Sequence, residues 1–444
     1  MHTNPPPNRA DFRPRFIRLA IVNIVSNLMV PLAGLIDMAF LGHLADIRHL
    51  AGVSLATVIF NYIYWSFGFL RMGTTGLTAQ AVGRGDRHDV LLTGFRNGIL
   101  AIALGMMLLM LQYPLRDIGF ALLNAAPDVR ASGEAFYDAR IWGSPAVLLN
   151  YVLIGWFLGR EKGALVLLFS AIVNGANVVL DYGFIVQMGW ESAGAGWATA
   201  LSQYLALMFG LAAVGRDVSW AEIRAIAPRL VDWAPLRAVF TLNGDILVRT
   251  FALTTAFAVF TNISAALGTV ALTTNTLLLQ IITLAAYFID GLAFATESIS
   301  GVIRGTGKTG QLVPLVRFSG GVSLAVGVTF ALPFVIRPDL FFSMLTNHQT
   351  ILDEVNRYVL WLLPILGFGS IAFILDGYFL GLTEGRILRN AMIVSTLLGF
   401  IPLAIAGWYF RSPHILWLSL TSFMLARSIT LAWQIPATLN AGKQ

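Results

Sequence analysis

The chain has 444 residues, of which 57% are hydrophobic and only 12% are charged, and its mean hydropathy is +0.74. A soluble domain carries about 25% charged residues, so this composition excludes a soluble globule and predicts a chain whose solvent is lipid. The absence of cysteine excludes disulfides, thiolate metal sites and cysteine nucleophiles. The net charge of +6 is typical of membrane topology rather than of a nucleic-acid partner.

The N-terminal segment, residues 1–14, is polar and proline-rich, and we expect a disordered tail without the cleavage site of a signal peptide. After it, apolar stretches long enough to cross about 30 Å of hydrocarbon recur along the chain. We place twelve of them, near residues 15–42, 50–80, 92–113, 133–158, 163–186, 194–214, 238–263, 269–300, 314–335, 354–381, 388–408 and 414–436.

These stretches lack the alternation of barrel strands, and only a helix satisfies its own backbone within one segment in lipid. The sequence therefore predicts an all-α polytopic membrane protein with twelve transmembrane helices. We expect an N-lobe of six spans over 15–214, a cytoplasmic linker over 215–237, a C-lobe of six spans over 238–436 and a tail over 437–444. The linker sequence is amphipathic and suits the membrane surface.

The distribution of Lys and Arg predicts that both termini face the cytoplasm. In that orientation the inner side carries 19 of the 29 Lys and Arg residues and the outer side carries 7. The remaining three, Arg71, Arg249 and Arg427, fall within spans. The opposite orientation would reverse this ratio and break the positive-inside rule.

Two turns at the inner ends of spans are nearly repeated. "GWFLGREKG" begins at Gly155 and "GYFLGLTEG" begins at Gly377, 222 residues later. A second pair, "AQAVGRGDR" from Ala79 and "SGVIRGTGK" from Ser300, has nearly the same offset. Because six spans separate the members of each pair, the halves have the same orientation and form parallel repeats, a plan used by transporters. The alternative is that glycine-rich turns recur by chance in a polytopic chain.

Acidic residues inside the predicted spans are the main candidates for the chemistry. They are Asp37 in span one, Asp181 in span five, Asp290 and Glu297 in span eight, and Asp376 in span ten. A charged group at the bilayer centre costs a few kcal/mol, about 2.5–3.5 on insertion scales, so each of these residues calls for a functional or structural reason.

Arginines supply possible partners for these acids. Asp245 and Arg249 lie four residues apart near the start of span seven, a spacing that favours a structural ion pair. Arg71 in span two is a candidate partner for an internal carboxylate. We expect Asp290 to face a central cleft, near Arg71, and to support transport without being the main coupling site.

Span five carries a polar face. Asn174, Asn177 and Asp181 stand at i, i+3 and i+7, so they share one side of the helix and cannot face lipid at low cost. Thr199 on span six and Tyr137 on span four could complete the cluster. A static polar network between helices is the alternative. The second half has no such cluster at the 222-residue offset, which favours a coupling site, since a network required by the fold should occur in both halves.

At these residues the chain resembles the MATE multidrug exporters and, among them, the DinF branch. The likeness covers essentially the whole chain. It is carried by "PLAGLIDMAFLGHL" in span one, "FLRMGTTGLTAQAVGRGD" in span two, the Asn177–Asp181 spacing, "YFIDGLAFATES" in span eight and the two glycine turns.

The resemblance implies a V-shaped pair of six-helix lobes that exports organic, often cationic compounds against an inward flow of H+ or Na+. It also implies that Asp37, Asn177, Asp181, Thr199 and, less closely, Tyr137 are the N-lobe cation and proton residues. The chain departs from the family in span one, where Val22 replaces a common proline. Pro31 could kink the helix elsewhere.

Physical chemistry favours a proton as the coupling ion. Two carboxyls in a partly dry cavity can hold a proton near neutral pH, whereas Na+ requires about five or six oxygen ligands, by analogy with other hard cations. Asp37, Asp181, Asn174, Asn177 and Thr199 could nearly supply them, so Na+ stays open. We expect no cofactor beyond the coupling ion, small organic substrates, contact with membrane lipids and no nucleic acid. We further expect a monomer in a bacterial inner membrane.

Three rival functions would each require features that the sequence lacks. A flippase for lipids or lipid-linked sugars would need a more basic cavity than Arg71 and Arg249 supply. A channel would need a filter-like loop, and none is present in the sequence. An intramembrane enzyme would need a metal cluster or an activated nucleophile. The six histidines lie in tails, loops or span ends without the i, i+4 spacing of a ligand pair, so we predict that the chain is not an enzyme.

Overall fold

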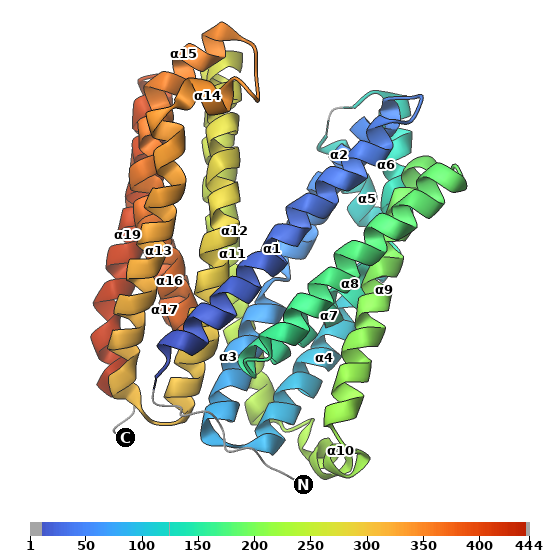
Figure 1. Cartoon of the computed structure of the whole chain (residues 1–444), viewed down its shortest axis with the longest axis vertical. Coiled ribbons are helices and arrows are strands. Elements are labelled where there is room, and N and C mark those ends of the chain that lie inside the picture. Colours follow the sequence, from blue (N-terminus) through green and yellow to red (C-terminus); the bar gives the residue numbers. More distant parts are fainter. Residues whose placement is uncertain (1–10, 124, 441–444) are drawn as a thin grey trace. The chain divides into compact units, whose positions relative to one another are not determined.

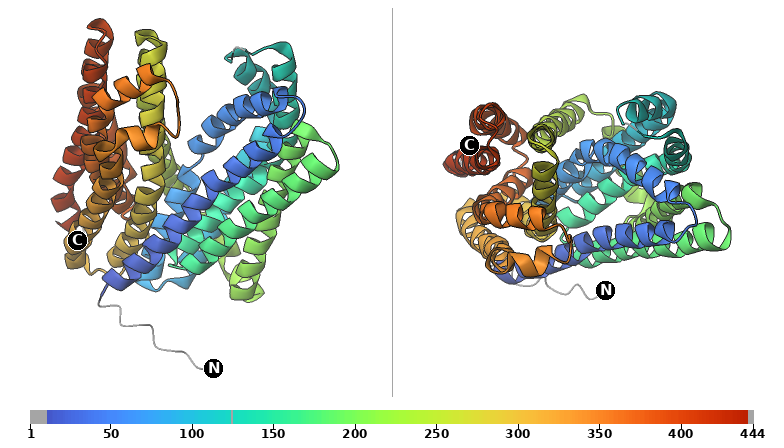
Figure 2. Two further views of the ribbon diagram at one scale, coloured as in Figure 1. Left: turned by 45° about the horizontal axis from the view of Figure 1, so that its top comes forward. Right: turned by 90° about the horizontal axis from the view of Figure 1, so that it is seen from above.

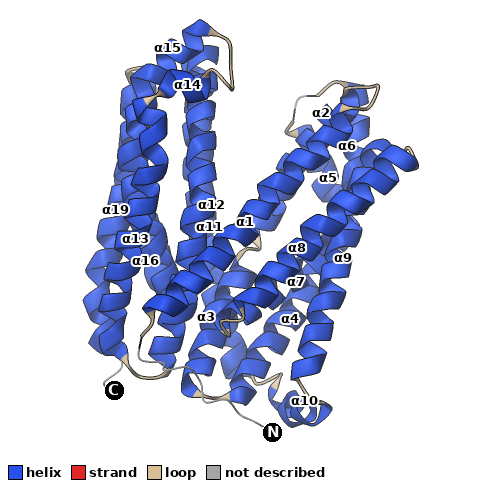
Figure 3. Ribbon diagram, viewed as in Figure 1, coloured by secondary structure: helices blue, strands red, loops and turns tan. Residues whose placement is uncertain are grey.

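The computed structural model describes residues 11–123 and 125–440, and this part of the chain is helical with no strand (Figure 3). Most of the predicted N-terminal tail, residues 1–10, and the end of the predicted C-terminal tail, residues 441–444, lie outside the described residues. Within the described part, twelve helical stretches are long and apolar enough to cross a membrane. The twelve-span prediction is confirmed.

The helices are labelled in Figure 1. Those of the first half are α1 Arg13–Gly42, α2 Arg48–Ser66, α3 Phe69–Arg84, α4 Arg87–Met110, α5 Gln112–Ala121, α6 Pro127–Arg140, α7 Ser144–Gly159, α8 Gly163–Asp181, α9 Glu191–Asp217 and α10 Trp220–Ile226. Those of the second half are α11 Trp233–Leu267, α12 Thr269–Gly305, α13 Leu312–Ile336, α14 Pro338–Phe342, α15 Gln349–Tyr358, α16 Leu362–Gly381, α17 Gly385–Val394, α18 Ile401–Tyr409 and α19 Pro413–Asn440.

Several spans consist of more than one helix. Span two is α2 followed by α3, and span four joins α6 to α7 through the short 3-10 turn Ile141–Gly143. Spans five and eleven each contain a π-helical segment, Tyr182–Gln187 after α8 and Ser395–Phe400 between α17 and α18. Such segments widen the helix locally and occur frequently at functional sites.

The helices gather into two compact units. One unit runs from Val25 to Asn243, and the other combines the described residues up to Ile24 with those from Gly244 onward. Helix α1 therefore contributes to both units, whereas the predicted lobe boundaries place all of span one in the N-lobe. Its first turns pack within the second unit, where the Phe16 ring meets the Phe318 ring edge-on at 5.6 Å between centroids.

The repeated glycines mark the same helix contact in each unit. Helix α7 packs on α3 in the first unit, and α16 packs on α12 in the second. A Cβ atom on Gly155 would lie 2.5 Å from the carbonyl oxygen of Arg71, and one on Gly377 would lie 2.4 Å from the carbonyl oxygen of Ala293. Both glycines permit an approach that no other residue allows. Each contacting pair is offset by 222 residues from the other.

The same offset continues one turn along these helices. A Cβ atom on Gly159 would lie 2.6 Å from the carbonyl oxygen of Thr75, and one on Gly381 would lie 2.1 Å from the carbonyl oxygen of Glu297. The residues after these glycines turn in the same way, because Glu161 and Thr383 both adopt left-handed φ angles, 56° and 58°. The internal repeat predicted from the sequence thus recurs contact by contact within the two units.

Span five packs against spans four and six of the first unit. Helices α8 and α9 run side by side (Figures 1 and 2), and α7 contacts both of them. In the second unit α16 packs between α12 and α19. The polar positions of spans five and six are therefore turned toward neighbouring helices of their own unit.

The predicted linker forms a short surface helix, α10. Ser219 caps it and Glu222 completes a capping box, with Arg87 at 3.0 Å from the Glu222 carboxylate. The backbone N–H of Ser219 and the guanidinium of Arg87 hold the pKa of Glu222 at about 2. Trp220 is 77% exposed while Ile226 is buried. This amphipathic arrangement suits the membrane surface, as the sequence predicts.

Candidate functional site

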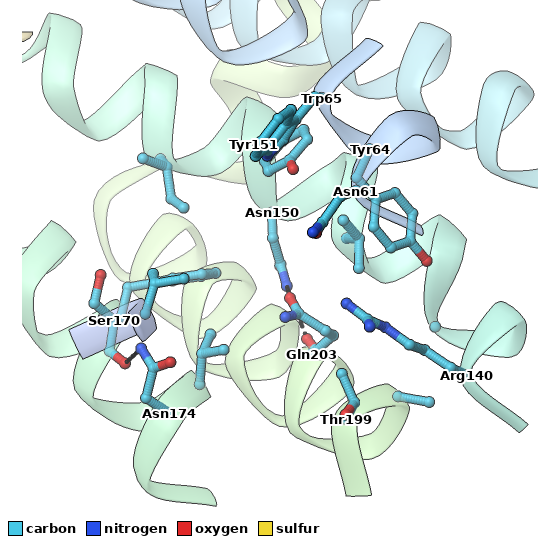
Figure 4. Close-up of a pocket in the computed structure, with 17 residues that line it drawn as sticks. Asn61, Tyr64, Trp65, Arg140, Asn150, Tyr151, Ser170, Asn174, Thr199 and Gln203 are labelled. Atoms are coloured by element: carbon cyan, nitrogen blue, oxygen red, sulfur yellow. Dashed lines mark hydrogen bonds between the residues drawn. The ribbon is translucent and has the colours of Figure 1, made fainter. Parts of the chain in front are cut away.

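The unit from Val25 to Asn243 contains a cavity of about 290 Å³ (Figure 4). Its wall is built by α1, α2, α6, α7, α8, α9 and the 3-10 turn after α6. Aromatic side chains and uncharged amides or hydroxyls make up most of the lining. The lining residues are Val30, Asn61, Tyr64, Trp65, Arg140, Gly143, Val147, Asn150, Tyr151, Ile154, Phe169, Ser170, Val173, Asn174, Thr199, Ala200 and Gln203.

Two of the predicted site residues line this cavity. The Asn174 side-chain amide donates to the carbonyl of Ser170 at 2.8 Å, and the Thr199 hydroxyl donates to the carbonyl of Ala195 at 2.9 Å. Both donors are thus used within their own helices. The acceptor oxygens of these two side chains are the groups that they can offer to a ligand or an ion.

Three further predicted residues lie beside the cavity lining, two of them buried (Asn177 and Asp181) and one partly buried (Asp37). The carboxyl groups of Asp37 on α1 and Asp181 on α8 are neighbours. Asp181 is fully buried, and neither of its carboxylate oxygens has a hydrogen-bond donor. The side-chain nitrogen of Asn177, one turn earlier on α8, is also buried without a partner. The shared face predicted for span five therefore brings Asp181 and Asn177 to the same interior as Asp37.

Two adjacent carboxylates can bond to each other only through a proton. Without one, both groups only accept hydrogen bonds and repel each other. A single shared proton converts the Asp37–Asp181 contact into an O–H···O bond and removes one charge from a buried site. Asp181 is also the last α-helical residue before the π-helical segment Tyr182–Gln187, a position where a change in helix packing is easily accommodated.

The carboxyl pair and the cavity are connected along two helices. Val30 and Asn174 line the cavity, and Asp37 and Asp181 lie seven residues after them on α1 and α8. Seven residues are two helical turns, so each acid lies on the same helix face as its lining residue, about 10 Å further along. Each acid therefore lies about two helical turns from a residue of the cavity lining on its own helix.

Arg140 is a site residue that the sequence analysis did not select. It lines the cavity, and its charge acts on Asp37. Its guanidinium carbon lies 4.5 Å from the Phe60 ring centroid, and its buried Nε atom has no hydrogen-bond partner. A signal for it exists in the sequence, because the predicted span 133–158 encloses Arg140.

Tyr137 lies one turn before Arg140 but is held in a different way. Its hydroxyl donates to the carbonyl of Gln112 at 3.1 Å, and its ring stacks on Phe60 with centroids 5.0 Å apart. Tyr137 is fully buried and does not line the cavity. These contacts place it in the packing that supports Arg140, and its predicted coupling role stays a prediction.

The second unit contains a separate charged cluster. Asp376 on α16 receives hydrogen bonds from Arg427 on α19, whose Nε lies 3.2 Å from Oδ1, and forms an ion pair with Arg249 on α11. All three side chains are buried, and the charge of Asp290 acts on Arg427. This cluster contains the C-lobe candidates Asp376 and Asp290 and adds two arginines to them.

The predicted helical pair of Asp245 and Arg249 is not the arrangement observed. Asp245 pairs with Arg389 on α17 at 2.5 Å, while Arg249 pairs with Asp376. Residue spacing indicates which side chains can meet along one helix, whereas the carboxylates of neighbouring helices offer buried guanidinium groups a better geometry.

The other C-lobe candidates have defined surroundings. Glu297 is fully buried on α12, at the level where α16 makes its closest approach to that helix. Arg71 lies on α3, and its charge acts on Tyr151 of the cavity wall. The expected proximity of Asp290 to Arg71 stays a prediction.

Comparison with known families gives a match over most of the chain. The family model described as MatE matches residues 23–183 and 246–412. DNA damage-inducible protein F of Escherichia coli is 31% identical over 419 residues, which are 93% of this chain and 90% of that protein. The probable multidrug resistance protein NorM of Thermotoga maritima is 23% identical over 373 residues, covering 82% of this chain and 78% of that protein.

Solved structures show the same fold. A MOP superfamily transporter from Pyrococcus furiosus superposes with a TM-score of 0.86 at 18% identity, covering 98% of both chains. An outward-facing multidrug resistance transporter of the MATE family superposes with a TM-score of 0.87 at 19% identity, again over 98% of both chains. At these identities the likeness is one of fold.

Proposed function

The chain belongs to the MATE family, whose members are transporters rather than enzymes, and from this premise we propose that it exports organic compounds by H+ antiport. In this proposal Asp37 and Asp181 carry the coupling proton. The relatives named as probable multidrug resistance proteins support organic substrates. The substrates expected from the family resemblance are lipophilic and often cationic.

The observation that carries the proposal is the contact between the buried Asp181 carboxyl and the partly buried Asp37 carboxyl. Both oxygens of Asp181 are buried without a donor, and Asp37 is the neighbouring acid. A proton needs only a base, and two adjacent carboxylates can share one proton between them. Asn177, with its unsatisfied amide nitrogen in the same interior, can donate to whichever carboxylate is charged.

Exchange follows if the proton and the substrate favour different states. Protonation of the Asp37–Asp181 pair removes the charge that attracts a cationic substrate and allows α1 and α8 to pack more closely. A cationic substrate in the cavity has the opposite effect, because it favours the deprotonated pair. A ligand shifts an equilibrium between two states only if it binds one state more tightly than the other. The proton and the cationic substrate meet this condition because each disfavours binding of the other.

Sodium is the alternative coupling ion. It would draw on the same two carboxylates and on the acceptor oxygens of Asn174, Asn177 and Thr199. The Asn174 and Thr199 donors are bonded to their own helices, which leaves oxygens available to a cation. The proton is favoured because it does not require all five groups to converge within the short distances of a hard-cation site.

The test is efflux from proteoliposomes with one gradient at a time. In Na+-free buffer, an imposed pH gradient should drive export of a fluorescent lipophilic organic cation in exchange for protons. Addition of the same cation to the protein in detergent should release protons. Asp37→Asn, which mimics a permanently protonated acid, should abolish this proton release while the protein remains folded. Asp128→Asn, which changes an exposed acid at the start of α6, is the matched control and should behave as wild type.

If transport stops without Na+ and returns when Na+ is added at constant pH, the proton proposal fails. The same five residues would then form a sodium site. Transport of phospholipid rather than of the organic cation would instead identify a flippase.

A further inference from the structure

The end of the first unit that carries α10 holds a cluster of cations. Asp217, the last residue of α9, pairs with Arg160 and, at 3.3 Å, with Lys162. Arg87, the first residue of α4, bridges the carboxylates of Asp217 at 3.5 Å and of Glu222 on α10 at 3.0 Å. Three cations meet two acids in these contacts, so this Asp217 cluster has one positive charge in excess.

The two acids do not fully compensate the cations. The Arg160 side chain is 9% exposed, its guanidinium carbon lies 4.1 Å from the Trp156 ring centroid, and its buried Nη1 has no hydrogen-bond partner. Burial and the charge of Arg160 lower the pKa of the Lys162 ammonium, against the opposite effect of Asp217. Cations that still repel one another in this way are stabilised by a further anion.

The Asp217 cluster is accessible from solvent on one side. The side chains of Lys162 and Arg87 are 36% and 37% exposed, in contrast to Arg160. An anion can therefore contact the ammonium and the Arg87 guanidinium directly, while Arg160 attracts it through its charge. An ammonium beside a planar guanidinium is a combination that binds phosphate groups well.

Exposed apolar side chains next to the cluster favour a lipid as the source of that phosphate. Helix α10 packs against α4 (Figure 1), and the segment around it exposes Trp220, Val231 and Trp233 by 77%, 79% and 71%. Tryptophan is enriched at the level of the lipid headgroups, whereas a soluble phosphate compound gains nothing from exposed indoles. The same segment also carries exposed arginines, which an anionic membrane surface attracts. They are Arg216, Arg224, Arg229 and Arg237.

We propose that the Asp217 cluster binds the phosphate headgroup of an anionic phospholipid, with the indoles of Trp220 and Trp233 at the level of the headgroups. The lipid phosphate contacts Lys162 and Arg87 and supplies the anion that the cluster lacks. Because the cluster joins the ends of α4, α7 and α9 to α10, the bound lipid also holds these ends together. This inference goes beyond the proposed export function and does not depend on the substrate or on the coupling ion.

The experiment measures lipid binding to the purified full chain in a neutral detergent. A short-chain phosphatidylglycerol should bind roughly tenfold more tightly than phosphatidylcholine of the same chain length, and added salt should reduce this difference. Lys162→Gln should weaken phosphatidylglycerol binding by about fivefold, the effect of one cation near an anionic surface, and leave phosphatidylcholine unchanged.

A fluorophore shows where the lipid binds. The chain lacks cysteine, so an environment-sensitive dye on Ala221→Cys labels α10 alone. Its emission should change with phosphatidylglycerol, and the change should move to about fivefold higher lipid concentration when Lys162→Gln is added.

Arg84→Gln is the matched control, because Arg84 lies at the same end of the unit and already pairs with Asp89. This variant should bind phosphatidylglycerol within about twofold of wild type. Arg87→Gln should weaken binding as Lys162→Gln does. Should Arg87→Gln fail to fold after losing its contact with Glu222, Arg87→Lys keeps the charge and should retain most of the binding.

Equal affinity of the wild type for the two lipids, the same weakening in Lys162→Gln and Arg84→Gln, or no response of the dye on α10 would overturn the proposal. Glycerol 3-phosphate serves as the soluble source of the same phosphate chemistry. Competition by glycerol 3-phosphate at the concentration of the lipid would identify a site for free phosphate compounds and overturn the assignment to a lipid.

Discussion

Single residues in this protein differ in whether their charges are compensated. In the first unit, the buried oxygens of Asp181 have no donor. In the second unit, Asp376 is bound by two guanidinium groups. Loss of the Asp376 charge would leave Arg249 and Arg427 facing each other without an anion. The first unit therefore suits proton exchange, and the Asp376 cluster suits a fixed scaffold.

A prediction follows for the second unit. Asp376→Asn should destabilise the protein by about 3–5 kcal/mol, the range for removing one partner of a buried ion pair.

Asp290 is only half-buried, so Asp290→Asn should destabilise the protein less than Asp376→Asn. It should reduce efflux of some substrates while gradient-driven transport stays detectable. Thermal unfolding in detergent and proteoliposome efflux would measure the two effects. Complete loss of coupling in Asp290→Asn, with Asp37→Asn still active, would reverse the assignment of roles.

Residue spacing predicted part of this site and missed another part. The i, i+3, i+7 pattern of Asn174, Asn177 and Asp181 identified one face of span five, since a helix fixes which of its own residues are neighbours. Spacing carries no information about contacts between helices distant in sequence. For that reason the cavity position of Arg140 and the partner of Arg249 became apparent only from the fold.

At the scale of elements, the repeated glycines mark very close helix contacts in each unit. Helix α7 crosses α3 at Gly155, and α16 crosses α12 at Gly377, with almost equal clearance. In lipid no hydrophobic force drives helices together, so close backbone approach and the resulting dispersion contacts carry much of the association. The helix contact leaves no room for a side chain, so both halves carry glycine at this position. The repeat could therefore be recognised in the sequence.

Gly155→Ala should therefore destabilise the first unit by about 1–3 kcal/mol, the cost of forcing an atom into a packed contact. Gly175 on α8 is the matched control, because a Cβ atom there meets nothing within 4 Å. Gly175→Ala should be neutral or slightly stabilising, since alanine favours a helix by up to about 1 kcal/mol over glycine. Comparison of the two melting temperatures in detergent measures the difference. Equal melting temperatures would show that α3 and α7 are not in the contact described.

The boundary within α1 could not be predicted from hydropathy. A continuous apolar stretch containing Pro31 gives one span, and the helix is continuous over Arg13–Gly42. Its first turns nevertheless pack with the second unit, where a Cβ atom on Gly291 would lie 2.5 Å from the Ile24 side chain. Hydropathy does not distinguish a residue that faces lipid from one that faces protein. The unit with which each part of α1 packs is therefore determined by tertiary contacts, which hydropathy does not contain.

At the scale of the whole molecule, composition and charge bias determine most of what could be predicted. The apolar composition required helices, and twelve spans follow from the number of apolar stretches. The predicted orientation in the membrane rests on the 19 to 7 distribution of Lys and Arg between the two sides. Because the chain lacks cysteine, any introduced cysteine is a unique reporter of the side on which it lies.

We predict that Ala221→Cys, on the exposed face of α10, is labelled by a membrane-impermeant maleimide only from the cytoplasmic side. Asp128→Cys, exposed at the start of α6, should be labelled only from outside. Three spans, an odd number, separate the two positions, so they must lie on opposite sides whatever the orientation. Labelling of both positions from one side would contradict the twelve-span count.

The span count leaves two possible orientations, and the distribution of positive charge selects between them. Labelling of intact cells that reaches Ala221→Cys but not Asp128→Cys would invert the topology and place the Asp37–Asp181 pair toward the other face of the membrane. The direction of proton flow proposed for export would then have to be reversed as well.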